Sequence, residues 1–271
     1  MSTSLTGKVA VITGSSRSIG AAIAKHMASQ GAKVVVNYVA GADAASEVVS
    51  AIKTAGGTAV AVQADVSTIA GGQHLVDESV KAFGGIDILV LNAGIMGSKV
   101  LADVDEAFFD AHFATNVKGP LFLAKAAASV LPAPGGRIIF FSTSLTGASS
   151  AFSALLTRLF LTQLYMYPAV SPTALVYTAT KGAVEQLSRI LAKDASLGAK
   201  GITVNTVSPG PVDTPLFRQG KPEALIAAIA KSAPSGRLGE VDDIAPVVSF
   251  LASPAAQWVN GQNVRVNGGF V

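Results

Sequence analysis

The sequence contains no cysteine in its 271 residues, which excludes disulfide bonds and thiolate metal sites. Charged residues make up only 14% of the chain and aromatic residues 6%, and the formal net charge is +3. It has no dense basic run and no basic stripe interleaved with aromatic residues, so we expect no nucleic-acid partner. A chain with so little charge indicates that other subunits cover part of its surface.

Targeting and membrane signals are also missing. Residues 1–8 lack the basic stretch followed by an apolar core that is typical of a secretory signal. The most apolar region near membrane length is 151–170, and it carries Arg158 and several polar residues, which argues against a membrane-spanning helix. We therefore expect a cytoplasmic protein with no membrane partner.

Short apolar runs rich in β-branched residues alternate with longer helical stretches. Strands are predicted at Lys8–Thr13, Lys33–Tyr38, Thr58–Gln63, Ile86–Leu91, Arg137–Ser142, Gly201–Val207 and Asn263–Val266. Helices are predicted near 19–30, 43–56, 69–84, 105–131, 177–198 and 241–253. Nearly continuous apolar runs are typical of parallel strands buried on both faces. The pattern predicts a single doubly wound α/β domain of the Rossmann type over residues 1–271, with a mostly parallel seven-stranded sheet and helices on both faces.

A glycine-containing turn joins the first predicted strand to the first predicted helix. Its glycines permit a tight turn and let the backbone approach a pyrophosphate at the helix N-terminus. The candidate phosphate-binding residues are Gly14, Ser16, Arg17, Ser18, Ile19 and Gly20. Such a turn also occurs as an ordinary strand–helix connection, and the motif alone leaves that alternative open.

The end of the second predicted strand, Asn37-Tyr38, bears on the choice of cofactor. An acidic residue there would hold a ribose 2′-hydroxyl and repel a 2′-phosphate, and Asn37 is neutral. Arg17 can pair with a 2′-phosphate through a charge-assisted contact. Both features favour NADP(H) over NAD(H), while a solvated Arg17 and a turn role for Asn37 remain the alternative. No metal site is expected.

Tyr177 and Lys181 form a Y-x-x-x-K pattern. Residues four apart lie on the same face of a helix, so the lysine ammonium can lie beside the tyrosine hydroxyl. A nearby positive charge is expected to lower the tyrosine pKa from its usual value of about 10. A tyrosine adjusted in this way can exchange a proton with a carbonyl oxygen. The pattern is common by itself, and a surface tyrosine beside a solvated lysine remains the alternative.

The order of these motifs resembles that of the short-chain dehydrogenase/reductase family. Residues 13–20 resemble its T-G-x-x-x-G-x-G turn, with Ser18 where the family usually has its middle glycine. A Cβ at that position either crowds the pyrophosphate or brings a hydroxyl that donates to it. Asp65-Val66, after the third predicted strand, resembles the family pair that contacts adenine.

Asn92-Ala93-Gly94, after the fourth predicted strand, resembles the family's N-A-G motif beside the adenosine ribose. In the family, the counterparts of Tyr177 and Lys181 also touch the cofactor. The resemblance covers nearly the whole chain and is closest to the carbonyl-reductase branch. That branch includes 3-oxoacyl-carrier-protein reductases and polyhydroxynaphthalene reductases.

The resemblance implies two further catalytic residues. Ser144, three residues before Gly147 in an S-x-x-G pattern, corresponds to the serine that holds the substrate oxygen, and Ser142 is the alternative. Asn116 corresponds to an asparagine that organises a water linking Lys181 to solvent.

The segment after the sixth predicted strand resembles the family's P-G segment beside the nicotinamide. The candidate cofactor-binding residues there are Pro209, Gly210, Val212 and Thr214. The apolar stretch 215–237 corresponds to the substrate loop, and its composition does not identify a substrate. The last strand in the family commonly packs against a partner subunit, which implies a homotetramer or a homodimer.

These features together predict an NADP(H)-dependent oxidoreductase that reduces a ketone or related carbonyl. A non-catalytic NADP(H)-binding sensor or subunit, and an alcohol or sugar dehydrogenase working oxidatively, remain alternatives. Ser144 and Tyr177 lie further apart than in the family because of an insertion at about 151–170. The insertion is interpreted as a lid or pocket wall, as an interface or membrane-surface element, or as a retained intron in the gene model.

Overall fold

The computed structural model describes residues 2–148 and 172–271. Seven strands form one sheet in the order β3-β2-β1-β4-β5-β6-β7, and every neighbouring pair is parallel. The strands are β1 (Val9–Ile12), β2 (Lys33–Tyr38), β3 (Thr58–Gln63), β4 (Ile88–Leu91), β5 (Arg137–Phe141), β6 (Thr203–Pro209) and β7 (Asn263–Val266). The predicted seven-stranded, doubly wound fold is confirmed.

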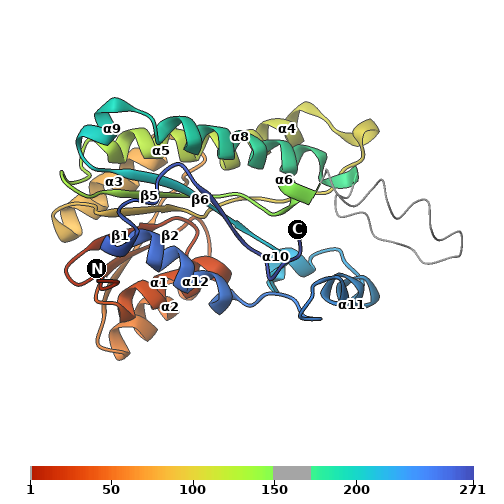
Figure 1. The fold of residues 1–271 in the computed structure, drawn as a ribbon, viewed down its shortest axis with the longest axis horizontal. Coiled ribbons are helices and arrows are strands. Elements are labelled where there is room, and N and C mark those ends of the chain that lie inside the picture. The colour runs from red at the N-terminus through yellow and green to blue at the C-terminus, as the bar shows by residue number, and fades with distance from the viewer. Residues whose placement is uncertain (1, 149–171) are drawn as a thin grey trace, which may run out of the picture.

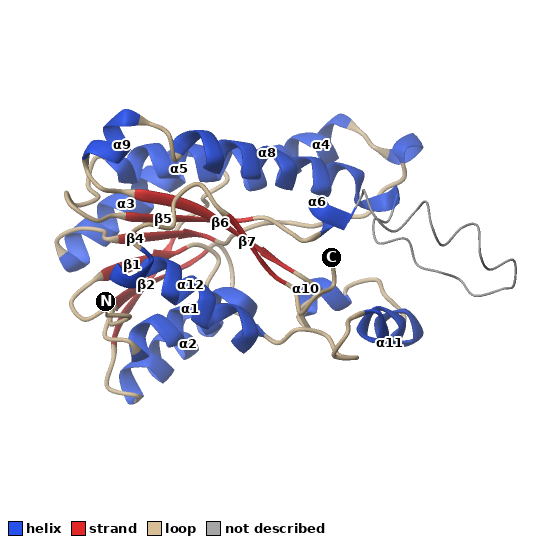
Figure 2. Ribbon diagram, viewed as in Figure 1, coloured by secondary structure: helices blue, strands red, loops and turns tan. Residues whose placement is uncertain are grey.

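Helices cover both faces of the sheet (Figures 1 and 2). One layer contains α1 (Ser18–Ser29), α2 (Ala42–Thr54) and α12 (Val241–Ala252), and the other contains α3 (Ile69–Phe83), α5 (Gly119–Ala128) and α8 (Leu175–Leu191). The short helices are α6 (Leu145–Ala148), α9 (Ala195–Ala199), α10 (Pro215–Arg218) and α11 (Glu223–Ser232). Because β1 lies between β2 and β4, the strand order reverses there, and a crevice is expected at the carboxyl ends of these strands.

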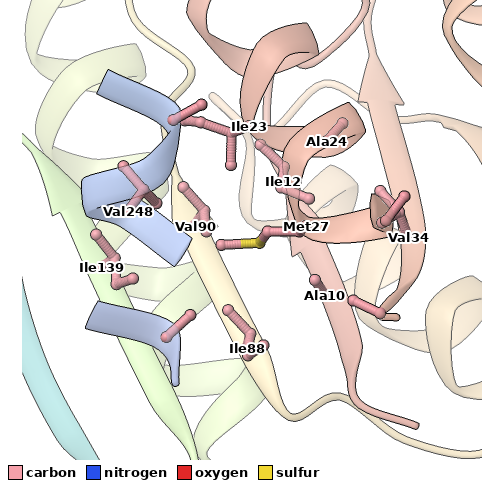
Figure 3. Packing of buried hydrophobic residues seen from close by; sticks show 14 of the residues in the cluster. Ala10, Ile12, Ile23, Ala24, Met27, Val34, Ile88, Val90, Ile139 and Val248 are labelled. Carbon is pink, nitrogen blue, oxygen red and sulfur yellow. The ribbon is translucent and has the colours of Figure 1, made fainter. Parts of the chain in front are cut away.

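Burial on both faces explains the apolar strands. All residues of β1, β4, β5 and β6 are buried, whereas exposed positions recur along the edge strands β3 and β7. Ile139 and its neighbour Phe140 belong to separate core clusters, because successive side chains of a strand point to opposite faces. Met27 of α1 and Val248 of α12 pack in the first cluster (Figure 3), and Leu123 of α5 packs in the second.

Three helical segments differ from the sequence prediction. The helix predicted at 105–131 consists of α4 (Glu106–Phe113), a π-helical turn η2 (Ala114–Lys118) and α5. The helix predicted at 177–198 divides into α8 and α9, with the Asp194 carboxylate capping α9. The expected substrate loop contains α10 and α11, and the Thr214 side chain caps α10.

Two further features concern expectations about membranes and metals. Within residues 2–148 and 172–271, no helix is long and apolar enough to cross a membrane. The same residues contain no group of three histidine or acidic side chains suited to a metal ion. The insertion expected at 151–170 lies outside the described residues.

Candidate active site

The turn between β1 and α1 is held from both sides by asparagine side chains. The Gly14 amide donates to Asn37 Oδ1 at 3.1 Å, and Asn92 Nδ2 donates to the Gly14 carbonyl at 3.1 Å. A Cβ on Gly20 would lie 2.5 Å from that carbonyl, so only glycine lets α1 begin so close to the turn. The turn is therefore rigid and presents backbone at a helix N-terminus.

Ser18 has a φ of +52°, and it is the one residue other than glycine with positive φ in the described part of the chain. This left-handed conformation costs a residue with a Cβ about 1–2 kcal/mol. Ser18 begins α1, and the exposed Arg17 occupies the N-cap position. No side chain of the described residues caps this helix, so its first N–H groups remain available to an anion.

Asn37, in β2, is buried and hydrogen-bonded through its side chain. It is 1% exposed, and its Nδ2 donates to the Ala64 carbonyl at 3.0 Å while its Oδ1 holds Gly14. Both ends of the Asn37 amide are thus used to fasten the turn to the end of β3, and the place of Asn37 beside the ribose stays a prediction. Tyr38, half-buried, and the exposed Arg17 remain nearest to that role.

The residues expected to bind the adenosine part of the cofactor lie directly after β3 and β4. The exposed Asp65 accepts hydrogen bonds from the Ser67 amide and hydroxyl at 3.0 and 2.7 Å, while Val66 is buried. The Ala93 amide donates to Thr13 Oγ1 at 2.9 Å. The loop after β4 is thus tied directly to the end of β1.

Asn116 joins that loop to α8 and lies in the π-helical turn η2, a kind of irregularity that is frequent at functional sites. Its Oδ1 accepts from the Ile95 amide at 2.9 Å, and its Nδ2 donates to Thr180 Oγ1 at 3.0 Å. A Cβ built on Gly94 would lie 3.2 Å from Asn116 Oδ1 and 3.4 Å from Lys181 Nζ. The structure therefore brings Asn116 and Lys181 together around Gly94.

Tyr177 and Lys181 lie one turn apart on α8. Lys181 Nζ is 5.7 Å from the centre of the Tyr177 ring and donates to the Phe141 carbonyl at 2.9 Å. Burial lowers the pKa of Lys181 to about 8. Burial also raises the pKa of Tyr177 to about 12, against the opposing effect of a hydrogen bond with Thr143. The expected lowering of the tyrosine pKa is corrected for the unliganded chain, because desolvation disfavours the charged form of both groups.

Three consecutive hydroxyl side chains follow β5 and point in different directions. Ser142 Oγ donates to Glu185 Oε1 at 2.6 Å, while Thr143 is the side chain whose hydrogen-bonding effect lowers the pKa of Tyr177. Ser142 therefore faces α8, whereas Ser144 faces β6 and the C-terminal tail. The assignment of Ser144, or Ser142, as the serine that holds the substrate oxygen stays a prediction.

Ser144 fastens the turn to the opposite side of the site. It is 1% exposed, its Oγ donates to the Ser208 carbonyl at 3.1 Å, and it accepts from Asn267 Nδ2 at 3.1 Å. A Cβ on Gly147 would lie 2.3 Å from the end of the flexible Arg265 side chain.

The P-G segment follows β6, which ends at Pro209. A Cβ on Gly210 would lie 2.8 Å from the Cβ of Asn267, so the glycine lets the C-terminal tail pack closely. Val212 and Thr214 are both buried, and the Thr214 hydroxyl accepts from the Phe217 amide. This segment lies at the carboxyl end of its strand, as the sequence predicts.

Thr143 and Glu185 are the site residues that sequence reasoning missed. Thr143 lies between Ser142 and Ser144, and these two serines match the family pattern more directly. Glu185 continues the four-residue spacing of Tyr177 and Lys181 by one more turn, a signal that was present in the sequence.

Comparisons with known proteins identify the family of this chain. Residues 8–155 match the family model described as short chain dehydrogenase, and residues 159–271 match the model described as Enoyl-(Acyl carrier protein) reductase. A probable tetrahydroxynaphthalene reductase from Zymoseptoria tritici is 39% identical, over 97% of this chain and 94% of its own. An Arabidopsis thaliana protein named NADPH-dependent aldehyde reductase-like protein, chloroplastic, is also 39% identical, over 98% of this chain and 95% of its own.

Among solved structures, a short chain dehydrogenase from Burkholderia cenocepacia J2315 in complex with NADP is 35% identical. It superposes with a TM-score of 0.84 and covers 98% of both chains. The family match over more than half of the chain, the reductase-named relatives and the shared fold agree. The chain therefore belongs to the short-chain dehydrogenase/reductase family, in its carbonyl-reductase branch, and is an oxidoreductase.

Proposed function

We propose that this enzyme uses NADP(H) to reduce a ketone or related carbonyl to an alcohol, with Tyr177 as the proton donor. The observation that carries the proposal is the convergence of three groups. Thr143 lies close enough to Tyr177 to lower its pKa by hydrogen bonding, and Lys181 Nζ lies 5.7 Å from the centre of the tyrosine ring. A carbonyl oxygen placed between the two hydroxyls would have two hydrogen-bond donors and a nearby proton source.

The turn after β1 fits a dinucleotide. Gly14 and Gly20 allow close backbone approach, and the uncapped N-terminus of α1 is suited to a pyrophosphate. The exposed Arg17 is suited to a 2′-phosphate, and no acidic residue ends β2. A relative named as NADPH-dependent and a neighbour solved with NADP support the preference for NADP(H) over NAD(H). When bound, the cofactor supplies the hydride.

Each catalytic side chain has a distinct task in this proposal. With a pKa near 12, the unliganded Tyr177 is protonated at neutral pH and so holds the proton that the alcohol oxygen needs. Thr143 donates a second hydrogen bond to the substrate oxygen and stabilises charge as it develops there. The Lys181 ammonium makes it easier for Tyr177 to give up its proton. Asn116 holds the loop beside Lys181, and Ser144 supports the Thr143 turn.

The substrate class and the assembly are also proposed. The naphthalene-reductase relative supports a ketone, quinone-like or aromatic polyketide carbonyl. A homotetramer or homodimer is supported by the edge strand β7, which has exposed positions, and by Trp258, which is 98% exposed. The cytoplasmic location remains a prediction, and the Arabidopsis relative is named as chloroplastic.

Loss of NADPH absorbance with a panel of ketones, diketones and quinones tests the proposal. Wild-type turnover should exceed that of Tyr177→Phe by several orders of magnitude, because the variant keeps the ring but has no proton to give. Both proteins should bind NADPH with similar affinity. Full turnover by Tyr177→Phe would refute the mechanism, and NADPH binding without turnover by the wild type would favour the sensor alternative.

A further inference from the structure

The Glu185 carboxylate contacts the turn that carries Thr143 on both sides of that residue. Its Oε1 accepts a hydrogen bond from Ser142 Oγ at 2.6 Å and another from Thr146 Oγ1 at 2.5 Å. The Thr146 hydroxyl also lies 2.8 Å from the Thr143 carbonyl oxygen, which closes the turn. One carboxylate oxygen therefore accepts hydrogen bonds from residues on both sides of Thr143.

The same helix carries the proton donor. Tyr177, Lys181 and Glu185 are spaced four residues apart on α8, so they lie along one face of the helix about one turn from each other. Ser142 Oγ lies 3.4 Å from the Lys181 carbonyl oxygen as well. The turn is thus attached to the helix face that holds Tyr177 through Glu185 and through Lys181, whose Nζ also donates to the Phe141 carbonyl.

The other side of the turn has a different anchor. Ser144 is bonded to the Ser208 carbonyl and to Asn267, which places it against β6 and the C-terminal tail. These contacts fix the turn relative to the sheet and have no direct bearing on α8. On the α8 side, the shortest hydrogen bonds to the turn are those that Glu185 accepts from Ser142 and Thr146.

We propose that Glu185 is a positioning residue that holds Thr143 in register with Tyr177 across the substrate oxygen. The proposal rests on the proposed function, in which these two hydroxyls share that oxygen. Hydrogen bonds from hydroxyls to a carboxylate are roughly twice as strong as neutral ones, so Glu185 holds the turn firmly. A displacement of about 1 Å at a catalytic group can lower a rate by about 100-fold, so loosening this turn should be costly.

Substitution of Glu185 gives the first test. Glu185→Ala should lower kcat/KM for the carbonyl by about ten- to 100-fold and leave the Kd for NADPH, measured by cofactor fluorescence, within about twofold of wild type. Glu185→Gln should recover most of the rate, because its amide oxygen can still accept from both hydroxyls. Gln186→Ala, on the next and exposed position of α8, is the matched control and should keep the wild-type rate.

A double-mutant cycle separates positioning from general stability. If Glu185 acts through Thr143, then Glu185→Ala should cost little further rate in a Thr143→Ala background. An equal loss in both backgrounds, or a wild-type rate for Glu185→Ala alone, would overturn the proposal.

A crystal structure of Glu185→Ala distinguishes this inference from the proposed function. If the wild type turned over no carbonyl, the proposed function would fail, and the position of Thr143 would still decide the role of Glu185. A Thr143 side chain displaced from Tyr177 supports the inference, and an unmoved one refutes it.

Discussion

Replacing Ser18 by glycine should stabilise the unliganded enzyme. Ser18 has a φ of +52°, in the left-handed region where a residue with a Cβ loses about 1–2 kcal/mol. Glycine adopts this conformation without that strain, but it loses about 0.5–1 kcal/mol more backbone entropy on folding. The difference is a net gain of up to about 1.5 kcal/mol, which for a chain of this length corresponds to a rise in Tm of up to about 6 °C.

Thermal and urea denaturation without cofactor, at one fixed protein concentration, measure this effect. Ser16→Gly is the matched control, because Ser16 lies in the same turn and is not among the residues with positive φ. It should leave stability unchanged or lower it, since glycine there relieves no strain. A Ser18→Gly enzyme no more stable than the wild type would show that the surrounding turn, and not the Ser18 backbone, carries the strain.

Three other predictions follow from the site. Because burial lowers the pKa of Lys181 to about 8, its ammonium is lost as the pH rises through that value, so kcat/KM for NADPH should fall above about pH 8. Lys181→Arg, which keeps its charge, should show no such fall, and a fall at the same pH in both proteins would assign it to another group. Arg17→Ala should raise the Kd for NADPH about tenfold or more, because a charge-assisted hydrogen bond is worth about 1.5–3 kcal/mol. The Kd for NADH should not change. A similar rise in Kd for both cofactors would contradict a contact between Arg17 and the 2′-phosphate. Thr143→Ala should lower kcat by about 100-fold, as expected for loss of a hydrogen-bond donor to the substrate oxygen. Ser144→Ala should mainly lower the free energy of unfolding, by about 1 kcal/mol. A large loss of kcat in Ser144→Ala, with a near wild-type kcat in Thr143→Ala, would assign the substrate-binding hydroxyl to Ser144.

The sequence predicts the sheet well because its signal is local. Strands buried on both faces need continuous apolar runs, and a run such as Arg137–Ser142 is visible without knowledge of its neighbours. The break in the helix predicted at 105–131 is not local. The π-helical turn there places Asn116 so that its amide reaches Ile95 and Thr180, and only the assembled fold supplies those partners.

The sequence predicts which segments form the candidate site, but it predicts less well which way their side chains point. The glycine turn, the N-A-G loop and the Tyr177–Lys181 pair lie at the carboxyl end of the sheet, as their order in the chain implied. The direction of Asn37 depends on Gly14, a contact across 23 positions that no local pattern reveals. The directions of the three adjacent hydroxyls depend on partners from α8, β6 and the C-terminal tail, which a pattern anchored on Gly147 cannot supply.

The side chains that hold the site together are largely asparagines. Asn37 and Asn92 fasten the Gly14 turn, Asn116 joins the loop after β4 to α8, and Asn267 joins the C-terminal tail to the loop after β5. An amide both donates and accepts, so one side chain can tie two backbone segments together. It also avoids the desolvation cost of a buried ion pair, which suits a chain with only 14% charged residues. This arrangement leaves the Lys181 ammonium with a backbone carbonyl as its hydrogen-bond partner, so its charge is free to act on Tyr177.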